Sequence, residues 1–529
     1  MNLLVDPLIR VRLFSGATEA RTLPGLCAAL ATDDVAAIPA LRPHQRHPLH
    51  AFLAQLATIA LHQAQRTELP NSEPEWLDLL RGLTVEYADD APWCMVVADP
   101  CKPAFMQCPA PSGLMDYRRQ TVTPDDLDLL VTAKNHDLKQ SLAARSEPED
   151  WFFALVTLQT AAGFLGAGNY GVARMNGGFS ARPCLGIAPA TGGIGAHFRC
   201  DVSRMLATRE TLLDEYRQYF QPKGGKTLLW LEPWDGSTSC DLMTLDPYFI
   251  EICRRVRLVD EGGALRARSA QSRKARIEAK AAHGVVGDFW TPINVKESKA
   301  LSVSSAGFRY DKLAPLLFDS AEYRHPPAMD VHGLKQNRWR VVARSIAGGQ
   351  GRTDGYHERT DIDFGVKTTT ALFRKAEQQQ LAHIAQEQIK EVREVIAALR
   401  LGIAVGASGG KEIGELNKAD RQFGAPYARR LDAAADARFF AALEKRFLAS
   451  GQDEGRNQRA DLARYLIGLA ASLLEEAVAA IPCASIRRYR ANARAQNAFW
   501  GRLRSPKSVF SDQAEIFDTK GGHHAAEQQ

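Results

Sequence analysis

Residues 163–183 read GFLGAGNYGVARMNGGFSARP, with glycines at 163, 166, 168, 171, 177 and 178. The residues just before them, 151–164, are apolar on most helical faces and predict a buried helix. Glycine accepts positive φ in tight turns, and its missing side chain lets backbone come close to a ligand. The stretch therefore predicts either a series of tight turns or a backbone surface that contacts a ligand.

The order of helix and glycines argues against one common fold. Gly166-x-Gly168-x-x-Gly171 matches the dinucleotide-binding fingerprint, which needs a strand before it and a helix opening at its end. Because a helix precedes it here and none clearly follows, a Rossmann fold is not expected. Donors for phosphate oxygens or base edges lie close by, at Arg174, Asn176 and Arg182.

The chain on either side of this stretch predicts an α+β protein with two folded parts. Its 529 residues exceed what a single core usually supports. Short β-like runs, helices and Gly/Pro turns alternate up to residue 365, which predicts a large mixed α/β N-terminal domain, 1–365. From 366 the sequence is rich in Ala, Leu, Glu, Gln and Arg and predicts a C-terminal four-helix bundle, 366–505. Its helical patterns span about 368–404, 428–449, 457–481 and 483–504, and residues 506–529 are expected to form a flexible polar tail.

Composition excludes several classes of protein. With 45% hydrophobic and 24% charged residues, the chain is typical of globular and not of disordered proteins. Its nine cysteines include no CxxC pair, so neither a zinc site nor a disulfide framework is predicted, and we expect no metal and no cofactor. No long uncharged apolar run occurs, so we expect no signal peptide and no membrane span, and hence a cytoplasmic protein.

Basic residues are distributed unevenly. The net charge of +5 permits a nucleic-acid partner without requiring one, so local runs matter more than the total. Either of two runs can be a solvated face or a surface that contacts phosphates. The first consists of Arg266, Arg268, Arg273, Lys274, Arg276 and Lys280, and the second of Arg487, Arg488, Arg490, Arg494, Arg502, Arg504 and Lys507.

Catalytic motifs are weak, so the protein is not expected to be an enzyme. Gly409-Gly410-Lys411-Glu412 lacks the Ser/Thr and the earlier glycine of a phosphate-binding loop, and no G-x-S-x-G elbow occurs. A metal-dependent nuclease is the alternative, because histidines and acids gather between 325 and 363. Since their spacing fits no metal motif, loop and surface positions are the preferred interpretation. The group is His325, Asp330, His332, His357, Glu358, Asp361 and Asp363.

Several segments resemble one known family, in the same order along almost the whole chain. MNLLVDPLIRVR at 1–12 resembles the N-terminus of the large subunit of Cascade, the type I-E CRISPR surveillance complex. The later segments follow in the same order as in that family. They are Phe105-Met106-Gln107, the helix with its glycine loop, the element from Trp230 to Gly236 and the helical C-terminal part. The resemblance implies an RNA-guided, antiviral DNA-recognition subunit with no enzymatic activity. Its implied partners are the other Cascade subunits, CRISPR RNA, double-stranded target DNA and a helicase–nuclease recruited after R-loop formation.

The resemblance also places three DNA-contacting elements, which read the protospacer-adjacent motif (PAM) from the minor groove and start strand separation. The lysine finger falls on Lys280, with Lys274 as the second candidate. The wedge loop of the family has an Asn-Asn-Gln-Ala core, which this chain replaces, so the usual PAM preference is not implied. The glycine loop corresponds to Gly166, Ala167, Gly168, Asn169, Tyr170 and Gly171, and the wedge loop to Gln350, Arg352, Thr353, Asp354 and Gly355.

A third hypothesis is a scaffold without DNA recognition, in which the glycine stretch is only a turn. Under the DNA-reading hypothesis, close approach of backbone to the minor groove explains the small residues of the loop. Arg352 can enter a minor groove or contact a phosphate, and Asp354 can accept a hydrogen bond from a base amino group.

Overall fold

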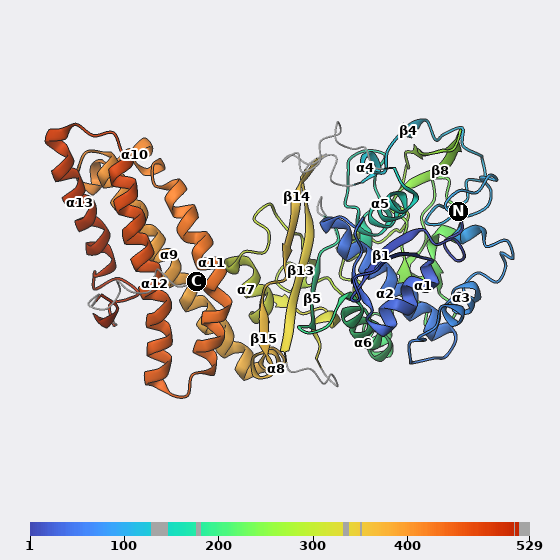
Figure 1. Ribbon diagram of the computed structural model, residues 1–529, viewed down its shortest axis with the longest axis horizontal. Helices are drawn as coiled ribbons and strands as arrows, with labels where there is room; N and C mark the ends of the chain where they lie inside the picture. Colours follow the sequence, from blue (N-terminus) through green and yellow to red (C-terminus); the bar gives the residue numbers. More distant parts are fainter. Residues whose placement is uncertain (129–145, 176–180, 332–337, 350–351, 513, 518–529) are drawn as a thin grey trace. The chain divides into compact units, whose positions relative to one another are not determined.

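The structure is a computed structural model that describes residues 1–128, 146–175, 181–331, 338–349, 352–512 and 514–517 (Figure 1). Unit 1 comprises Met1–Phe308 and Ser320–Val366, and unit 2 comprises Arg309–Asp319 and Lys367–Gln529. Unit 1 mixes helices and strands, whereas the described part of unit 2 is helical, which confirms the predicted fold class. Unit 2 also takes in Arg309–Asp319, a segment that the sequence analysis had assigned to the N-terminal domain.

The helices of unit 1 form much of its core. Helix α2 (Arg46–Gln63) and helix α5 (Pro148–Ala161) are buried on nearly all faces, because apolar residues occupy most positions of both. Helix α5 begins with Pro148 in its first turn and a capping box at Glu147, which fixes where the helix starts. In the described part of unit 1, the other α-helices are α1 (Leu23–Thr32), α3 (Glu73–Gly82), α4 (Pro124–Leu127), α6 (Ile194–Glu215) and the first residue of α8 (Val366–Ala371).

The longest strand, β13 (Arg338–Gly349), organises the largest sheet, in which it pairs with β14 (Arg352–Arg359), β15 (Asp363–Gly365) and β5 (Cys184–Pro189). A second sheet has the order β4-β9-β8, from Arg119–Thr121, Ala264–Ala270 and Arg255–Glu261. Three further sheets pair β1 (Ile9–Leu13) with β2 (Thr18–Arg21) and β3 (Val35–Ala37), β10 (Ile293–Asn294) with β11 (Lys299–Ala300) and β12 (Tyr323–Arg324), and β6 (Lys226–Leu228) with β7 (Leu245–Ile250).

The described part of unit 2 has four long helices, three of which lie within a few residues of the predicted spans; the predicted span 368–404 is divided, because α8 ends at Ala371 and the first long helix begins at Lys375. The four long helices are α9 (Lys375–Ala407), α11 (Ala425–Leu448), α12 (Gln452–Ala480) and α13 (Ser485–Leu503). Helix α9 packs against the other three. A Cβ at Gly402 would lie 3.1 Å from the Ala495 carbonyl oxygen, so glycine allows α13 to come close to α9. Helix α10 (Lys418–Gln422) is short, and α7 (Tyr310–Phe318) packs beside α9.

The predicted flexible tail from 506 does not begin there. Phe510 and Ile516 are buried, and Arg459 donates to the Val509 carbonyl oxygen at 2.8 Å. Burial of these two apolar side chains favours packing of the segment on unit 2, which its polar average composition did not indicate. Among the described residues, no helix is long and apolar enough to cross a membrane.

Candidate functional site

The glycine loop leaves the end of α5 and turns tightly. Gly166 and Gly168 have φ values of +92° and +83°, which side chains with a Cβ rarely adopt. The Asn169 amide donates to the Gly166 carbonyl oxygen at 3.1 Å, which closes the turn. Ala167 and Tyr170 are exposed, Tyr170 by 37%. The loop therefore presents backbone and one aromatic ring to solvent at its tip.

A buried arginine closes the base of this loop. Arg254 donates from Nη1 to the Gly171 carbonyl oxygen at 2.7 Å and from Nη2 to that of Gly163 at 2.6 Å. Burial lowers the pKa of the Arg254 guanidinium. Its planar fork spans the two ends of the loop, a geometry that a single ammonium group cannot reproduce. Arg254 thus holds the entry and exit of the loop together, and the sequence analysis missed it.

Gly171 is glycine for an internal reason. A Cβ at this position would collide with the backbone of Cys253, whereas a Cβ at Gly166 would meet open space. The glycines therefore have different structural roles at different positions. Gly171 permits close packing inside the protein, and Gly166 and Gly168 permit the turn.

A cleft of about 930 Å³ opens beside the loop, and we call it the glycine-loop cleft. Leu165 and Asn169 of the loop line it together with the β4-β9-β8 sheet and the turn at Asp235 and Gly236. Basic and acidic side chains share its wall, and the volume suits a ligand of nucleotide size or larger. The charged lining residues are Asp116, Arg118, Arg119, Asp126, Asp128, Asp235, Arg254, Arg255 and Arg273.

A strap from Gln271 to Lys274 connects the loop to that turn. The Ser272 amide donates to the Gly168 carbonyl oxygen at 2.9 Å, and the amides of Arg273 and Lys274 donate to that of Gly236 at 2.7 and 3.1 Å. Lys274 is exposed and follows Ser272 by two residues. Lys280, also exposed, begins a separate 3-10 turn. Of the two lysine-finger candidates, Lys274 is the one tied to the glycine loop by hydrogen bonds of its own strap.

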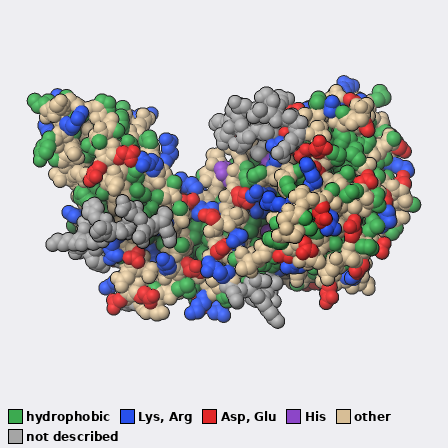
Figure 2. Space-filling view, viewed as in Figure 1, with side chains coloured by type: hydrophobic (Ala, Val, Ile, Leu, Met, Phe, Trp, Pro, Cys, Tyr) green, Lys and Arg blue, Asp and Glu red, His purple; other side chains and the backbone are tan. Residues whose placement is uncertain are grey.

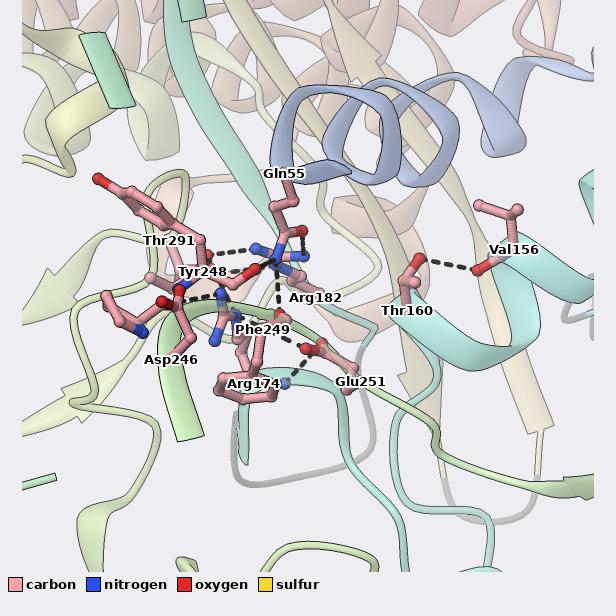
Figure 3. Close-up of polar contacts among 12 residues, drawn as sticks. Gln55, Val156, Thr160, Arg174, Arg182, Asp246, Tyr248, Phe249, Glu251 and Thr291 are labelled. Carbon is pink, nitrogen blue, oxygen red and sulfur yellow. Dashed lines mark hydrogen bonds and ion pairs between the residues drawn. The ribbon is translucent and has the colours of Figure 1, made fainter. Parts of the chain in front are cut away.

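Arg174 and Arg182 correct the sequence analysis, because they are buried and do not face a ligand (Figure 3). Arg182 forms an ion pair with Asp288 and donates to the Gln55 side chain at 3.2 Å. The Arg174 guanidinium lies 4.1 Å from the centre of the Phe249 ring and 3.6 Å from Glu251. Acids inside the core outweigh the desolvation of Arg182, whose pKa is raised, and offset only part of the desolvation of Arg174, whose pKa burial lowers. They stabilise the segment after the glycine loop from within.

The first basic run is also not a continuous face. Arg276 is buried beside the Trp234 ring, and it donates to the Glu232 and Pro233 carbonyl oxygens at 3.1 and 3.2 Å. Arg268 pairs with Glu261 at 2.7 Å. The view in Figure 2 shows Lys and Arg interspersed with Asp and Glu over the face drawn, in keeping with the small net charge.

Neither the family models nor the curated proteins include a match to the chain, but solved structures match it. Cse1 from Thermobifida fusca is 15% identical with a TM-score of 0.64, over 95% of this chain and 97% of that one. The CRISPR-associated protein Cse1 from Acidimicrobium ferrooxidans is 15% identical at a TM-score of 0.61, with coverages of 95% and 97%. Thermus thermophilus CasA (Cse1) is 14% identical at 0.59, with coverages of 95% and 99%.

The chain has the Cse1 fold. The likeness spans nearly the whole of both chains, so it includes both units. At 14–15% identity it concerns the fold, and the roles of single residues rest on the geometry of this chain.

Within this Cse1 fold, the predicted wedge loop falls where the antiparallel strands β13 and β14 meet. Strands β13 and β14 pair up to Gly349 and Arg352, so the described residues on either side of 350–351 lie in strands. Thr353 is buried, Asp354 is half-buried, and Gly355 has a φ of +129° where the register shifts. Gln350 and the predicted supporting residue Asn176 lie outside the described residues, as does the side chain of Arg352.

Three of the four acids of the alternative nuclease site pair with arginines. Asp363 pairs with Arg340 at 2.9 Å, and Glu358 pairs with Arg344 at 2.8 Å. Asp361 likewise pairs with Arg359. His332 lies outside the described residues. In the described part of the Cse1 fold, this group does not converge on a common point where an ion could bind.

Another group does converge, namely His50, His197 and Asp201. Asp201 Oδ2 lies 2.8 Å from His50 Nε2, 3.3 Å from His197 Nε2 and 2.8 Å from the indole nitrogen of Trp290, and its other oxygen pairs with Arg204. With four partners already in place, Asp201 serves as a hydrogen-bonding centre that joins α2, α6 and the chain near Trp290. The adjacent guanidinium also disfavours a bound cation.

The same group predicts an acid-sensitive fold. Burial and the neighbouring His50 lower the pKa of His197 from 6.5 to about 4, so the unfolded state binds the proton more tightly. Stability is therefore lost as the pH falls below about 6.5, and the loss levels off near pH 4. We expect His197→Gln to recover roughly 2 to 3 kcal/mol of this acid-induced loss between pH 7 and 4.5, measured by urea unfolding. His383→Gln, at a side chain that is 73% exposed, is the control and should leave the pH dependence as it is. An unchanged pH profile in His197→Gln would contradict the assignment.

Proposed function

We propose that the chain is the DNA-recognition subunit of an RNA-guided Cascade complex, without catalytic activity of its own. The carrying observation is a glycine loop tied at both ends by Arg254, on the rim of a cleft, in a chain with the Cse1 fold. A backbone surface that is fixed in advance loses little entropy on binding, so it suits a recognition role.

In this proposal the loop enters the minor groove of the target duplex and reads the PAM. Its exposed part has small residues and backbone groups, which fit a groove about 6 Å wide. Asn169, half-buried at the cleft, supplies an amide side chain, and Tyr170 supplies a ring that can pack against sugars. Lys274 lies on the adjoining strap and contacts a phosphate. Because the minor groove distinguishes fewer bases than the major groove, several PAM sequences should be accepted.

Strand separation follows at the β13–β14 hairpin. A hairpin is stiffer than a loop, because the ladder from Ala343 to Gly349 supports its end. Opening the first base pairs costs roughly 1–2 kcal/mol per step, and pairing with the guide RNA then approximately offsets the lost DNA duplex. The protein therefore has to open only the first pairs next to the PAM.

The proposed partners are the other Cascade subunits, CRISPR RNA, target DNA and a helicase–nuclease, all in the cytoplasm. Helix α13 begins with a surface that supports protein docking. Ile486 is 91% exposed and Tyr489 is 88% exposed, with Arg487, Arg488 and Arg490 exposed beside them. Exposed aromatic and arginine side chains of this kind are typical of interface centres.

Gly168→Asp is expected to abolish PAM-dependent binding of target DNA while the complex still assembles. The new side chain would stand at a φ of +83°, with its Cβ 2.7 Å from the Gln271 side chain, and its charge would repel phosphates. We expect affinity for a PAM-containing duplex to fall at least about a hundredfold, towards the level of non-specific binding. The measurement is binding of the reconstituted complex to a library of PAM duplexes.

Gly262→Asp is the matched control. Gly262 also has a positive φ, +69°, with open space around it, but it lies in the β8–β9 turn. It should carry a similar conformational penalty without changing DNA binding. If the Gly168→Asp complex binds the PAM duplexes with the same affinities as the wild type, the minor-groove proposal is wrong and the scaffold hypothesis is favoured. A single required sequence read from the major groove would also contradict it.

A further inference from the structure

Unit 2 carries a hollow of about 360 Å³ between α7, α9 and the start of α11, and we call it the arginine hollow. Apolar side chains from α9 and α11 form part of its wall, including Ile396 and Ala428. Charged side chains from all three elements surround it. They are Arg309, Asp311, Arg393, Arg400, Arg429 and Asp432.

Two of the four arginines are already neutralised. Arg309 pairs with Asp432 at 2.6 Å and lies 3.4 Å from Asp311, which raises the pKa of Arg309 although burial works against it. Arg393 approaches Asp311 at 3.9 Å. These contacts fix the two aspartates and their arginines at the side of the hollow formed by α7.

The other two arginines are uncompensated. Arg400 and Arg429 are exposed, and neither has an ion pair within the described residues of the chain. With four arginines and two aspartates in the lining, the hollow has a surplus of two positive charges. The first turn of α11 contributes no acidic residue that would reduce this surplus.

The floor of the hollow is rigid. The Tyr310 amide donates to Asp436 at 2.7 Å, and its hydroxyl donates to Asp432 at 3.1 Å. The Tyr310 ring packs 4.8 Å from that of Phe439, centre to centre. Since α7 is anchored to α11 in this way, the hollow does not depend on a mobile loop for its shape.

We propose that the arginine hollow binds backbone phosphates of a nucleic-acid strand through Arg400 and Arg429. A guanidinium donates two parallel hydrogen bonds to phosphate oxygens and keeps its charge at all physiological pH values. The commitment to a nucleic-acid strand, and not a free phosphate, rests on the proposed function. The arginine hollow would give unit 2 a phosphate contact of its own, in addition to the contacts proposed for the glycine loop of unit 1.

The test compares Arg400→Gln/Arg429→Gln with a control of equal charge change, Lys445→Gln/Arg456→Gln. Lys445 lies on the same helix as Arg429, 16 residues further on, which is about 24 Å along the axis. Arg456 lies near the start of α12, and both control residues are exposed. The full chain is titrated with a fluorescent single-stranded oligonucleotide and with a duplex, each between 50 and about 300 mM salt.

We expect the slope of log affinity against log salt to fall by roughly 1.4 to 1.8, the value for two lost phosphate contacts. At about 0.1 M salt this corresponds to an affinity loss of roughly 25- to 60-fold, independent of sequence. The control should change the slope by much less. Thermal unfolding should be the same in all three proteins, since the four substituted side chains are exposed.

The outcomes separate this inference from the proposed function. Equal slopes in the wild type and the Arg400/Arg429 variant would overturn the inference, even if Gly168→Asp abolishes PAM discrimination. A lowered slope together with intact PAM discrimination in Gly168→Asp would support the hollow and contradict the glycine-loop proposal. If inorganic phosphate alone stabilises the wild type but not the variant, and oligonucleotides bind both equally, the site takes a free anion and the nucleic-acid assignment is wrong.

Discussion

Replacing Arg254 with methionine is expected to weaken PAM-dependent DNA binding by roughly tenfold or more, without preventing assembly of the complex. The substitution removes the donors that join the Gly163 and Gly171 carbonyl oxygens, 2.6 and 2.7 Å from the guanidinium. A buried carbonyl that loses its partner costs about 1–3 kcal/mol, and 1.4 kcal/mol is a factor of ten in binding. The two ends of the glycine loop can then separate, and the loop no longer has one conformation ready for the groove.

Methionine is the informative replacement, because its unbranched chain can follow the aliphatic part of the arginine side chain and it removes a buried cation. Burial lowers the pKa of Arg254, so the charged form is held at a cost in free energy. Removing the buried charge recovers free energy of folding, which offsets part of the free energy lost with the hydrogen bonds. We therefore expect a modest change in stability beside a large change in recognition. Arg254→Lys should bind DNA with intermediate affinity, since one ammonium reaches one end of the loop better than both.

Arg257→Met is the matched control for this experiment. Arg257 is also buried, its pKa is also lowered by burial, and it also donates to carbonyl oxygens, among them that of Lys102 at 3.0 Å. Its partners lie between Val97 and Cys108 and not in the glycine loop. Both variants should lose a similar amount of stability, but only Arg254→Met should lose DNA recognition. If both or neither lose recognition, Arg254 is not a positioning residue for the loop.

Asp288→Asn is expected to destabilise unit 1 by about 3–5 kcal/mol, the usual result of breaking one partner of a buried ion pair. Asp288 accepts from Arg182 Nε at 2.8 Å and from the Thr291 hydroxyl at 2.6 Å, and Arg174 lies 3.8 Å away. Without this carboxylate, the buried Arg182 guanidinium loses its ion-pair partner, while Arg174 keeps Glu251 at 3.6 Å. Urea unfolding of the full chain at pH 7 measures the change. Asp89→Asn, at an exposed pair with Lys102, is the control and should leave the transition unchanged.

The difference in free energy of unfolding between the wild type and Asp288→Asn should depend on pH with a definite sign. Burial alone would raise the pKa of Asp288, but Arg182 outweighs it and holds that pKa well below its usual range. A carboxyl group with a depressed pKa contributes stability above its unfolded-state value, and that contribution is lost as the pH falls. The wild type and Asp288→Asn should therefore differ fully at pH 7, and the difference should begin to shrink below about pH 4 and shrink further as the pH falls towards the folded-state pKa. A constant difference down to pH 3 would show that the effect comes from packing and not from the charge.

The local patterns of the sequence predicted much of the fold. The helices of unit 2 follow from their apolar periodicity, because a helix places every third or fourth residue on the buried face. The excursion of α7 into unit 2 was not predictable, since Tyr310–Phe318 has no local feature that selects α9 and α11 as its neighbours. The packing of residues 506–512 and 514–517 was missed for the same reason, because the burial of Phe510 and Ile516 decides it.

For the candidate site, too, the sequence determined one part and the tertiary structure determined the other. The position of the glycine loop after a buried helix was determined by the sequence alone, because turns and helix ends are encoded by neighbouring residues. Which arginines face a ligand was decided only by the tertiary structure. Arg174, Arg182 and Arg254 look alike in sequence, but the first two neutralise buried acids and the third binds the loop. A charged side chain acquires its role from partners that are distant along the chain, so only the folded packing distinguishes these three.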